Sequence, residues 1–296
     1  MIIDFINKLC FKSQMSEFKE EVIPPGAVLS DKDIINELND NVVIIPFNRE
    51  QLGSNSYDTT LGEYYYERDD SNIPEFFNPL YGKHIAQFWG VKADPNEHYG
   101  AKKASTVTTK NEAEKYGLKM GDQYILIKRG HIILAHTGEF LGGRVNVTTM
   151  MKARSTIGRG GLTIACCAGA GDTGYFNRYT YEIHNRNPMT VVLKVGERIG
   201  QIWFMRTGEV MVSYEKRGQY QQTTSITQLI TQWDPSDMLP KSAIEYMRTQ
   251  GPLHESSVSY TDDILKVLHK YVIPPPEEQT ESPSSIMPKI ENVVIV

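Results

Sequence analysis

KARSTIGRGGLTIACCAGAGDTGYFNRYTYEIHN, residues 152–185, is the stretch of this sequence that says most about the fold and its site. Its first ten residues combine arginines and hydroxyl side chains with glycines. Glycines let backbone amides approach a ligand closely, and guanidinium groups present forked donors to phosphate oxygens. The stretch therefore predicts a triphosphate site formed by Arg154, Ser155, Thr156 and Arg159. It lacks the GxxxxGK[ST] spacing of a Walker loop.

Two carboxylates follow in the same stretch. Asp172 lies in a glycine-rich turn, and Glu182 lies in a strand expected at Tyr179–His184. Alternate residues of a strand share a face, so Thr180, Glu182 and His184 are expected on one face. A glutamate on such a strand near arginines indicates either an ion pair or a functional carboxylate. The ordinary alternatives are a hairpin turn, surface ion pairs and a solvated glutamate.

Short strand candidates surround this stretch on both sides, punctuated by Gly, Asn, Asp and Pro. Many short strands without long helices between them predict a mainly β sandwich, barrel or jelly roll. The candidates are Val42–Ile45, Ile85–Trp89, Tyr124–Lys128, Ile132–His136, Leu162–Cys167, Tyr179–His184, Val191–Lys194, Ile202–Met205 and Val210–Tyr214.

Helical patterns lie mainly outside the strand-rich region. Ser30 is expected to cap a short helix, and a second short helix is expected at 111–116 within a polar insertion, 94–119. Helical spacing recurs at Ile226–Trp233, Ser242–Thr249 and Asp262–Tyr271. We therefore divide the chain into an N-terminal extension (1–27), a central domain (28–224), a helical C-terminal extension (225–272) and a tail expected to be disordered (273–296).

Composition narrows the class of protein. The 296 residues carry a net charge of -5, with 40% hydrophobic and 23% charged residues, as in soluble globular proteins. No polybasic run is present, which argues against a nucleic-acid polymer as partner. No apolar run approaches the roughly 20 residues of a membrane helix. Three cysteines, two of them the adjacent Cys166 and Cys167, indicate no disulfide framework and favour the cytoplasm.

The stretch resembles the signature of the dCTP deaminase family. In that family an RSS-x-x-R-x-GL segment is followed by a D-x-G-[FYW] turn and a T-L-E-x-x-N strand. Here these stand at 154–162, 172–175 and 180–185, at matching intervals. The similarity covers 28–224 in order, including LSDKDI at 29–34 and SYDTTLG at 56–62. It implies a dUTPase-like distorted β-barrel or jelly roll with short helices, assembled as a homotrimer with active sites between subunits.

The resemblance implies hydrolytic deamination of dCTP to dUTP and ammonia without zinc. The sequence is consistent with a zinc-independent reaction, because it contains neither the H-x-E nor the P-C-x-x-C motif of zinc deaminases. Glu182 would be the general base, with Ser155 and Arg159 completing the catalytic set. Arg159 would also favour the charged form of Glu182. Asp172 would anchor the deoxyribose; in dUTPase relatives the corresponding acid activates the water that attacks phosphorus.

Substrate contacts carried over by the resemblance extend beyond the catalytic set. Mg²⁺ would travel on the substrate phosphates. The substrate-binding residues implied are Arg154, Ser155, Thr156, Arg159, the backbone at Ala168, Asp172, Tyr214, Tyr220 and Gln222. Two positions depart from the family: its lysine before the second tyrosine is Gln219, and the arginine of its SYDxRLG motif is Thr60.

Three other functions stay open at this point. A bifunctional enzyme would carry dCTP on to dUMP and pyrophosphate with the same residues. A pure dUTPase is disfavoured by Glu182 and by the absence of a glycine-rich C-terminal arm. A non-catalytic trimeric binding protein would have no need of that glutamate. The expected ligands are dCTP and also dUTP or dTTP, with no membrane partner.

Overall fold

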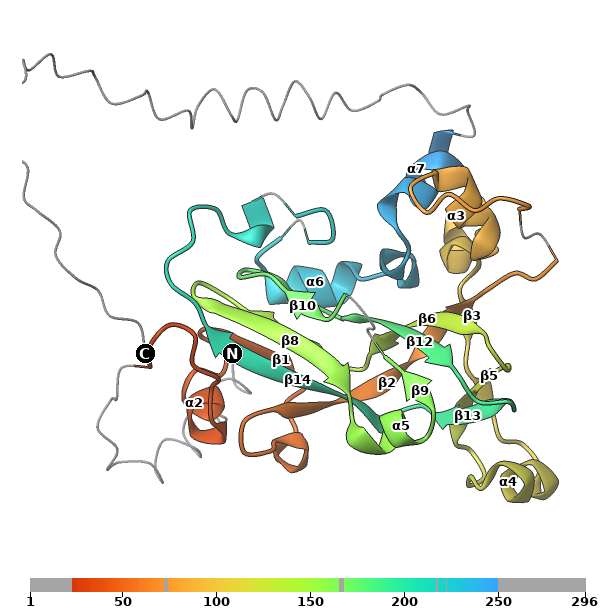
Figure 1. Cartoon of the computed structure of the whole chain (residues 1–296), viewed down its shortest axis with the longest axis horizontal. Helices are drawn as coiled ribbons and strands as arrows, with labels where there is room; N and C mark the ends of the chain where they lie inside the picture. The colour runs from red at the N-terminus through yellow and green to blue at the C-terminus, as the bar shows by residue number, and fades with distance from the viewer. Residues whose placement is uncertain (1–22, 72–73, 165–167, 217, 222, 250–296) are drawn as a thin grey trace, which may run out of the picture. The chain divides into compact units, whose positions relative to one another are not determined.

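Strands dominate the structure, a computed structural model that describes residues 23–71, 74–164, 168–216, 218–221 and 223–249 (Figure 1). The mainly β prediction is confirmed, and the helices are short. The strands are β1 Val42–Ile45, β2 Tyr57–Glu67, β3 Lys102–Lys103, β4 Ser105–Thr106, β5 Gln123–Ile127, β6 Ile132–Thr137, β7 Phe140–Gly143, β8 Val147–Ala153, β9 Leu162–Thr163, β10 Ala170–Gly171, β11 Phe176–Asn177, β12 Thr180–Asn185, β13 Val191–Lys194 and β14 Arg198–Arg206.

Short helices connect and flank these strands. None of them, in the described ranges, is long and apolar enough to cross a membrane. The α-helices are α2 Asp31–Asn36, α3 Gly82–Phe88, α4 Lys110–Tyr116, α5 Ser155–Arg159, α6 Ile226–Gln232 and α7 Lys241–Thr249. The 3-10 helices are η1 Arg49–Gln51, η2 Pro95–Gly100, η3 Tyr214–Lys216 and η4 Pro235–Met238.

Three antiparallel sheets organise the strands. The largest has the order β10-β8-β14-β2-β6-β12-β9, with β3 paired to β2. The other two have the orders β1-β7-β11 and β13-β5-β4. Neighbouring strands in the large sheet come from distant parts of the sequence, so it joins the segment at 152–185 to both halves of the chain. The main core lies against this sheet and includes Tyr57, Tyr181 and Phe204, all fully buried.

The alternation expected in β12 is confirmed. Tyr181 and Ile183 are fully buried, whereas Thr180, Glu182 and His184 lie half-buried on the other face. β12 pairs with β6 in a register that sets Glu182 opposite Leu134. The phenol of Tyr181 lies 2.6 Å from the Thr59 hydroxyl, so the buried ring has a hydrogen-bond partner in the core. β12 is therefore fixed from its inner face, and the Glu182 face is left for other contacts.

The helix caps follow from local sequence. Ser30 caps α2, as expected from the sequence, and the side chain of Asp33 completes a capping box with it. Thr109 and Glu112 do the same for α4, which ends at Gly117 in the left-handed conformation (φ 65°). The helix expected at 111–116 is therefore confirmed.

The C-terminal helices expected at 226–233 and 242–249 are confirmed as α6 and α7. α7 lies beside α3 (Figure 1), and the two helices pack together. Leu239 and Ile244 join Tyr66 and Leu134 of the large sheet in a second hydrophobic cluster. Residues 226–249 therefore pack on the β-rich body, whereas the helix expected at 262–271 lies outside the described residues.

Two strand predictions were wrong and one is partly tested. Residues 85–88 belong to the helix α3, because apolar residues at this spacing bury Ile85 and Ala86 against α7. Residues 210–213 form no strand in the described structure, and Val210, Met211 and Val212 are exposed. The strand expected at 162–167 is β9 for its first two residues, and 165–167 lie outside the described residues.

Candidate functional site

The predicted phosphate-binding residues at 154–159 begin where β8 ends. Arg154 precedes α5, and its backbone N–H donates to the Ile199 carbonyl at 2.9 Å. Its Nε lies 3.1 Å from Asp58 Oδ2, and Arg198 Nη1 lies 3.4 Å from the same oxygen. Burial raises the pKa of the Asp58 carboxyl, and the two arginines oppose that shift. Arg154 is thus held in position by a carboxylate.

The rest of this group is open to solvent. The glycine-rich loop expected here is a five-residue helix, α5, which exposes Ser155, Thr156 and Arg159. Ala168 is exposed as well, and the neighbouring Gly169 carbonyl accepts a 2.7 Å hydrogen bond from the Met151 N–H of β8. Ser155, Thr156, Arg159 and Ala168 are therefore all exposed, on segments that adjoin the end of β8.

A second group forms around the turn at 172–175. Asp172 is exposed. The Tyr214 N–H donates to the Thr173 carbonyl at 2.9 Å, and the Tyr214 ring meets the Tyr175 ring edge-on at 5.0 Å. Tyr220 follows on the same segment, and its carbonyl accepts a hydrogen bond from the side chain of Asn177 at 3.0 Å. Residues 214–216 and 218–221 are therefore folded against the turn that carries Asp172.

Gln221 anchors residues 218–221 to this turn through its side chain, a role that the sequence did not predict. Its side chain is 2% exposed. Its Oε1 accepts from the Phe176 N–H at 2.7 Å, and its Nε2 donates to the Gly174 carbonyl at 2.9 Å. The sequence assigned the terminal contact to Gln222, which lies outside the described residues. The pair of adjacent glutamines was the available signal, but pattern alone does not say which of them is buried.

Glu182 forms a third group in the middle of β12. Burial raises the pKa of its carboxyl, and a hydrogen bond with its own backbone opposes the shift. Within the described part of one chain, no ion pair joins Glu182 to Arg154 or Arg159. The expectation that Arg159 favours the charged form of Glu182 is therefore not met inside a single chain, and it stays a prediction for an assembly.

The register explains this separation. β9, which follows α5, pairs with the far end of β12 through Leu162 and Asn185. Glu182 lies three residues before Asn185, which is about 10 Å along an extended strand. Ser155 and Arg159 are therefore placed beyond the end of β12. Two incomplete groups on one chain are the arrangement expected if neighbouring subunits complete each site.

His136, on the neighbouring strand β6, has a structural role. His136 Nδ1 donates to the Thr137 carbonyl at 2.8 Å, and its Nε2 accepts from the Tyr64 N–H at 3.3 Å. The Trp233 ring lies 4.6 Å from the imidazole. Burial lowers the pKa of His136 to about 4, so the ring is neutral at physiological pH. With both nitrogens engaged, it is not placed to exchange protons with a substrate.

The departure at Thr60 has a clear structural consequence. Glu139 is 3% exposed, and its carboxylate accepts from Gln51 Nε2 at 2.8 Å. Thr60 supplies two more donors, its hydroxyl at 2.9 Å and its N–H at 3.0 Å. Three neutral donors thus satisfy this carboxylate where the resembling family places an arginine. A buried carboxylate costs free energy unless hydrogen bonds or a cation satisfy it.

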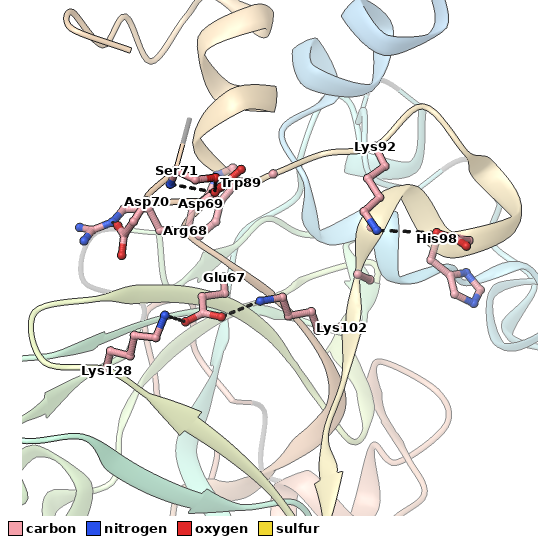
Figure 2. A pocket seen from close by; sticks show the side chains of 14 residues that line it. Glu67, Arg68, Asp69, Asp70, Ser71, Trp89, Lys92, His98, Lys102 and Lys128 are labelled. Atoms are coloured by element: carbon pink, nitrogen blue, oxygen red, sulfur yellow. Dashed lines mark hydrogen bonds and ion pairs between the residues drawn. The ribbon is translucent and has the colours of Figure 1, made fainter. Parts of the chain in front are cut away.

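Cavities bordered by the described residues also lie outside the predicted set. One, of about 710 Å³, is bordered by residues of 67–71 and 89–102. Figure 2 shows that Glu67 points toward Lys102 and Lys128 inside it. The charges of this cavity are largely paired with one another. Another, of about 530 Å³, borders Gly174 and Ser213, next to the Asp172 turn.

Among the residues that the structure describes, no group of three or more His, Cys, Asp or Glu side chains is placed to hold a metal ion. A magnesium ion that arrives on substrate phosphates needs no more than one or two protein carboxylates. Asp172, Glu209 and Glu215 lie on or beside the second cavity and are of that kind.

Comparisons with known proteins show which family this chain resembles. A family model described as dCTP deaminase-like matches residues 88–207. A protein of Leptospira biflexa named "dCTP deaminase, dUMP-forming" is 30% identical over 199 residues, which span 67% of this chain and 92% of that protein. A protein of Methanococcus vannielii with the same name is 29% identical over 203 residues, with 67% and 92% covered. The crystal structure of 2'-deoxycytidine 5'-triphosphate deaminase from Agrobacterium tumefaciens aligns at 17% identity with a TM-score of 0.43, over 62% of this chain and 50% of that one.

Proposed function

This chain belongs to the dCTP deaminase family, and on that premise we propose that it hydrolytically deaminates the cytosine of dCTP. The observation that carries the proposal is Glu182, a half-buried carboxylate at the family's glutamate position, with its pKa raised by burial. A carboxylate with a raised pKa is a stronger proton acceptor near neutral pH than an ordinary glutamate. A binding protein without catalysis would have no use for such a group.

The reaction can be written with this chain's own residues. Glu182 accepts a proton from water as the water oxygen forms a bond to C4 of cytosine. The proton is then passed to N3, and a second transfer to the amino group lets the C4–N bond break. Ammonia leaves, C4 becomes a carbonyl and Glu182 returns to its ionised form. Ser155, Arg159 and the backbone at Ala168 would hold the water from a neighbouring subunit.

We further propose that the product is dUMP, in place of the dUTP expected from sequence. The support is that both relatives above are named dUMP-forming, and that this chain covers 92% of each of them. In this second hydrolysis a water attacks the α-phosphorus, the bond to the bridging oxygen breaks and pyrophosphate leaves. Asp172 is exposed beside the 214–221 segment and is the carboxylate we assign to that water.

Replacement of Asp172 by asparagine is expected to separate the two reactions. Deamination should continue, because Glu182 is intact, while pyrophosphate release should fall by about a hundredfold or more, the range for loss of a catalytic base. dUTP should then accumulate, which ion-exchange chromatography of the nucleotides would show. Glu114→Gln, at an exposed position of α4, is the matched control. Equal dUMP formation by Asp172→Asn and wild type would remove Asp172 from this role.

The pH dependence of the deamination rate should reflect the ionisation of Glu182. Because burial raises its pKa above the ordinary value of 4.5, the ionised base is lost at a higher pH than for a free glutamate. The rate should therefore fall on the acidic side as pH drops through the raised pKa, and level off above it. Measuring kcat/KM from pH 4 to pH 9 in one mixed buffer tests this. An acidic limb at or below 4.5 would contradict it.

The assembly, the ion and the compartment are also proposals. We propose a homotrimer, supported by the separation of Glu182 from Ser155 and Arg159 within one chain, with Mg²⁺ carried on the substrate phosphates. The cytoplasm remains the expected compartment, on cysteine usage. Sedimentation equilibrium of the full chain decides the oligomeric state, and a monomer active on dCTP would contradict the shared site.

A further inference from the structure

The cavity next to the Asp172 turn is the feature that the proposed mechanism does not use. Its volume of about 530 Å³ is in the usual range for small-molecule sites, about 300–1,000 Å³. Gly174 forms one side of it, and Ser213 and Lys216 come from the segment folded against the turn. The cavity therefore adjoins the residues that we assign to the nucleotide.

Arg144 enters this cavity from the end of β7. Its backbone is fixed by a 2.8 Å hydrogen bond from its N–H to the Asn41 carbonyl. Its guanidinium lies over the Phe176 ring, 4.7 Å from the centroid. The Nε is buried and has no hydrogen-bond partner, and no carboxylate pairs with Arg144 in the described part of the chain.

A positioned guanidinium without a carboxylate is suited to an anion. The Nε is covered by protein atoms, so a ligand in the cavity would meet the terminal nitrogens of the guanidinium. The Phe176 ring supports the guanidinium from one side. Guanidinium groups present forked donors to phosphate oxygens. Arg206 precedes Thr207, which lines the cavity. It differs from Arg144 because its guanidinium is paired with the carboxylate of Glu37.

The remaining charges of the cavity fit a phosphate chain that carries a divalent cation. Lys216 adds a second cation, and Glu209 and Glu215 add carboxylates. Glu215 accepts a hydrogen bond from Ser213, which sets its orientation. A magnesium–polyphosphate needs both signs of charge, cations for the phosphate oxygens and carboxylate oxygen or water for the metal. Gln219, on the same segment, is uncharged.

We propose that Arg144 and Lys216 bind the terminal phosphates of the nucleotide triphosphate in this cavity. The inference rests on the proposed function and assigns two residues to the site that the sequence motifs did not include. They supply positive charge next to a segment in which Gln219 stands where the family has lysine.

The test is Arg144→Gln in the full chain, with Arg129→Gln, at an exposed position in the turn between β5 and β6, as the matched control. KM and kcat for dCTP, and binding of inorganic tripolyphosphate with Mg²⁺ by calorimetry, are measured for each. Arg144→Gln should raise KM and weaken tripolyphosphate binding about tenfold or more, with kcat changed little, the effect of losing a charge-assisted hydrogen bond. Lys216→Gln should act in the same direction, and Arg144→Lys should restore part of the loss.

The outcomes separate this inference from the proposed function. If wild type deaminates dCTP while both glutamine variants keep its KM and its tripolyphosphate affinity, the inference is overturned and the function stands. If wild type leaves dCTP intact but binds tripolyphosphate through Arg144, the function fails and the phosphate site stands. A wild type that does not bind tripolyphosphate overturns the site. Lys216 lies on a 3-10 helix that has no buried residue. Lys216→Gln therefore tests the site even if the Arg144 variant does not fold.

Discussion

Replacing Glu182 by glutamine is expected to lower the rate of dCTP deamination by about a hundredfold to ten-thousandfold, the usual contribution of a general base. Glutamine keeps the size and the strand position of the side chain, but it cannot accept the proton of water. The loss should appear in kcat and kcat/KM together, because proton transfer belongs to the transition state. Ammonia release from dCTP is the measurement.

The control for this variant is Glu197→Gln, a surface glutamate near Lys194. It should keep wild-type activity. Near-normal ammonia release by Glu182→Gln would exclude Glu182 as the base and leave the family fold without an assigned catalytic residue.

The same substitution should leave the fold as stable or make it more stable. A carboxyl whose pKa is raised by burial stabilises the fold while protonated, and this contribution is lost as pH rises through its pKa. At neutral pH the ionised Glu182 therefore lowers the free energy of unfolding, and an uncharged glutamine removes this destabilisation. An unchanged or higher melting temperature, with the activity lost, would show that the loss is chemical. A large fall in melting temperature would instead point to a structural role.

Replacing Asn185 by alanine is expected to destabilise the protein by about 3–5 kcal/mol, because several buried polar groups would lose their partners. Asn185 closes the T-x-E-x-x-N motif and is fully buried. Its Nδ2 donates to the carbonyls of Ile127 at 2.9 Å and Met189 at 2.8 Å, and its Oδ1 accepts from the Asn187 N–H at 2.9 Å. This motif residue therefore ties β12 to the neighbouring turns.

Urea unfolding monitored by far-ultraviolet circular dichroism measures the effect. Asn111→Ala, at an exposed position of α4, is the control and should change stability little. A variant of Asn185 with unchanged stability and weakened dCTP binding would reverse the assignment, making Asn185 a substrate contact.

Sequence predicted the strands whose apolar pattern was unambiguous. β1 and β13 have the residue ranges that were expected, and the two faces of β12 are as the alternation indicated. β2 and β8 were missed because hydroxyl residues interrupt their apolar pattern. Inside the fold these hydroxyls find partners from β12 and the residue before it: Thr59 meets Tyr181 at 2.6 Å, and Thr149 meets Tyr179 at 2.5 Å. Such pairing depends on tertiary structure, which a local pattern does not contain.

The error at residues 85–88 has a related cause. A short apolar run is compatible with a buried strand or a buried helix, and periodicity alone does not separate them. The helix is favoured here because α7, more than 150 residues later in the chain, covers its apolar side. Contacts between segments so far apart cannot be read from local spacing.

The candidate site was predicted as a set of residues but not as an arrangement. The motif gave Glu182, Asp172 and the 154–159 group, and the structure places them in separate regions of one chain. Gln221 and Arg144 were not predicted, because their roles come from burial against the Asp172 turn and from a ring beneath a guanidinium. Those properties exist only once the chain is folded.

The most direct test of the account is one time course in which ammonia and pyrophosphate are measured together. The purified full chain is incubated with dCTP and Mg²⁺, and the nucleotides are separated at each point. The account predicts that ammonia and pyrophosphate appear in equal amounts and that dUMP is the nucleotide formed. Intact dCTP, or pyrophosphate released from added dUTP with no ammonia from dCTP, would contradict the deaminase assignment.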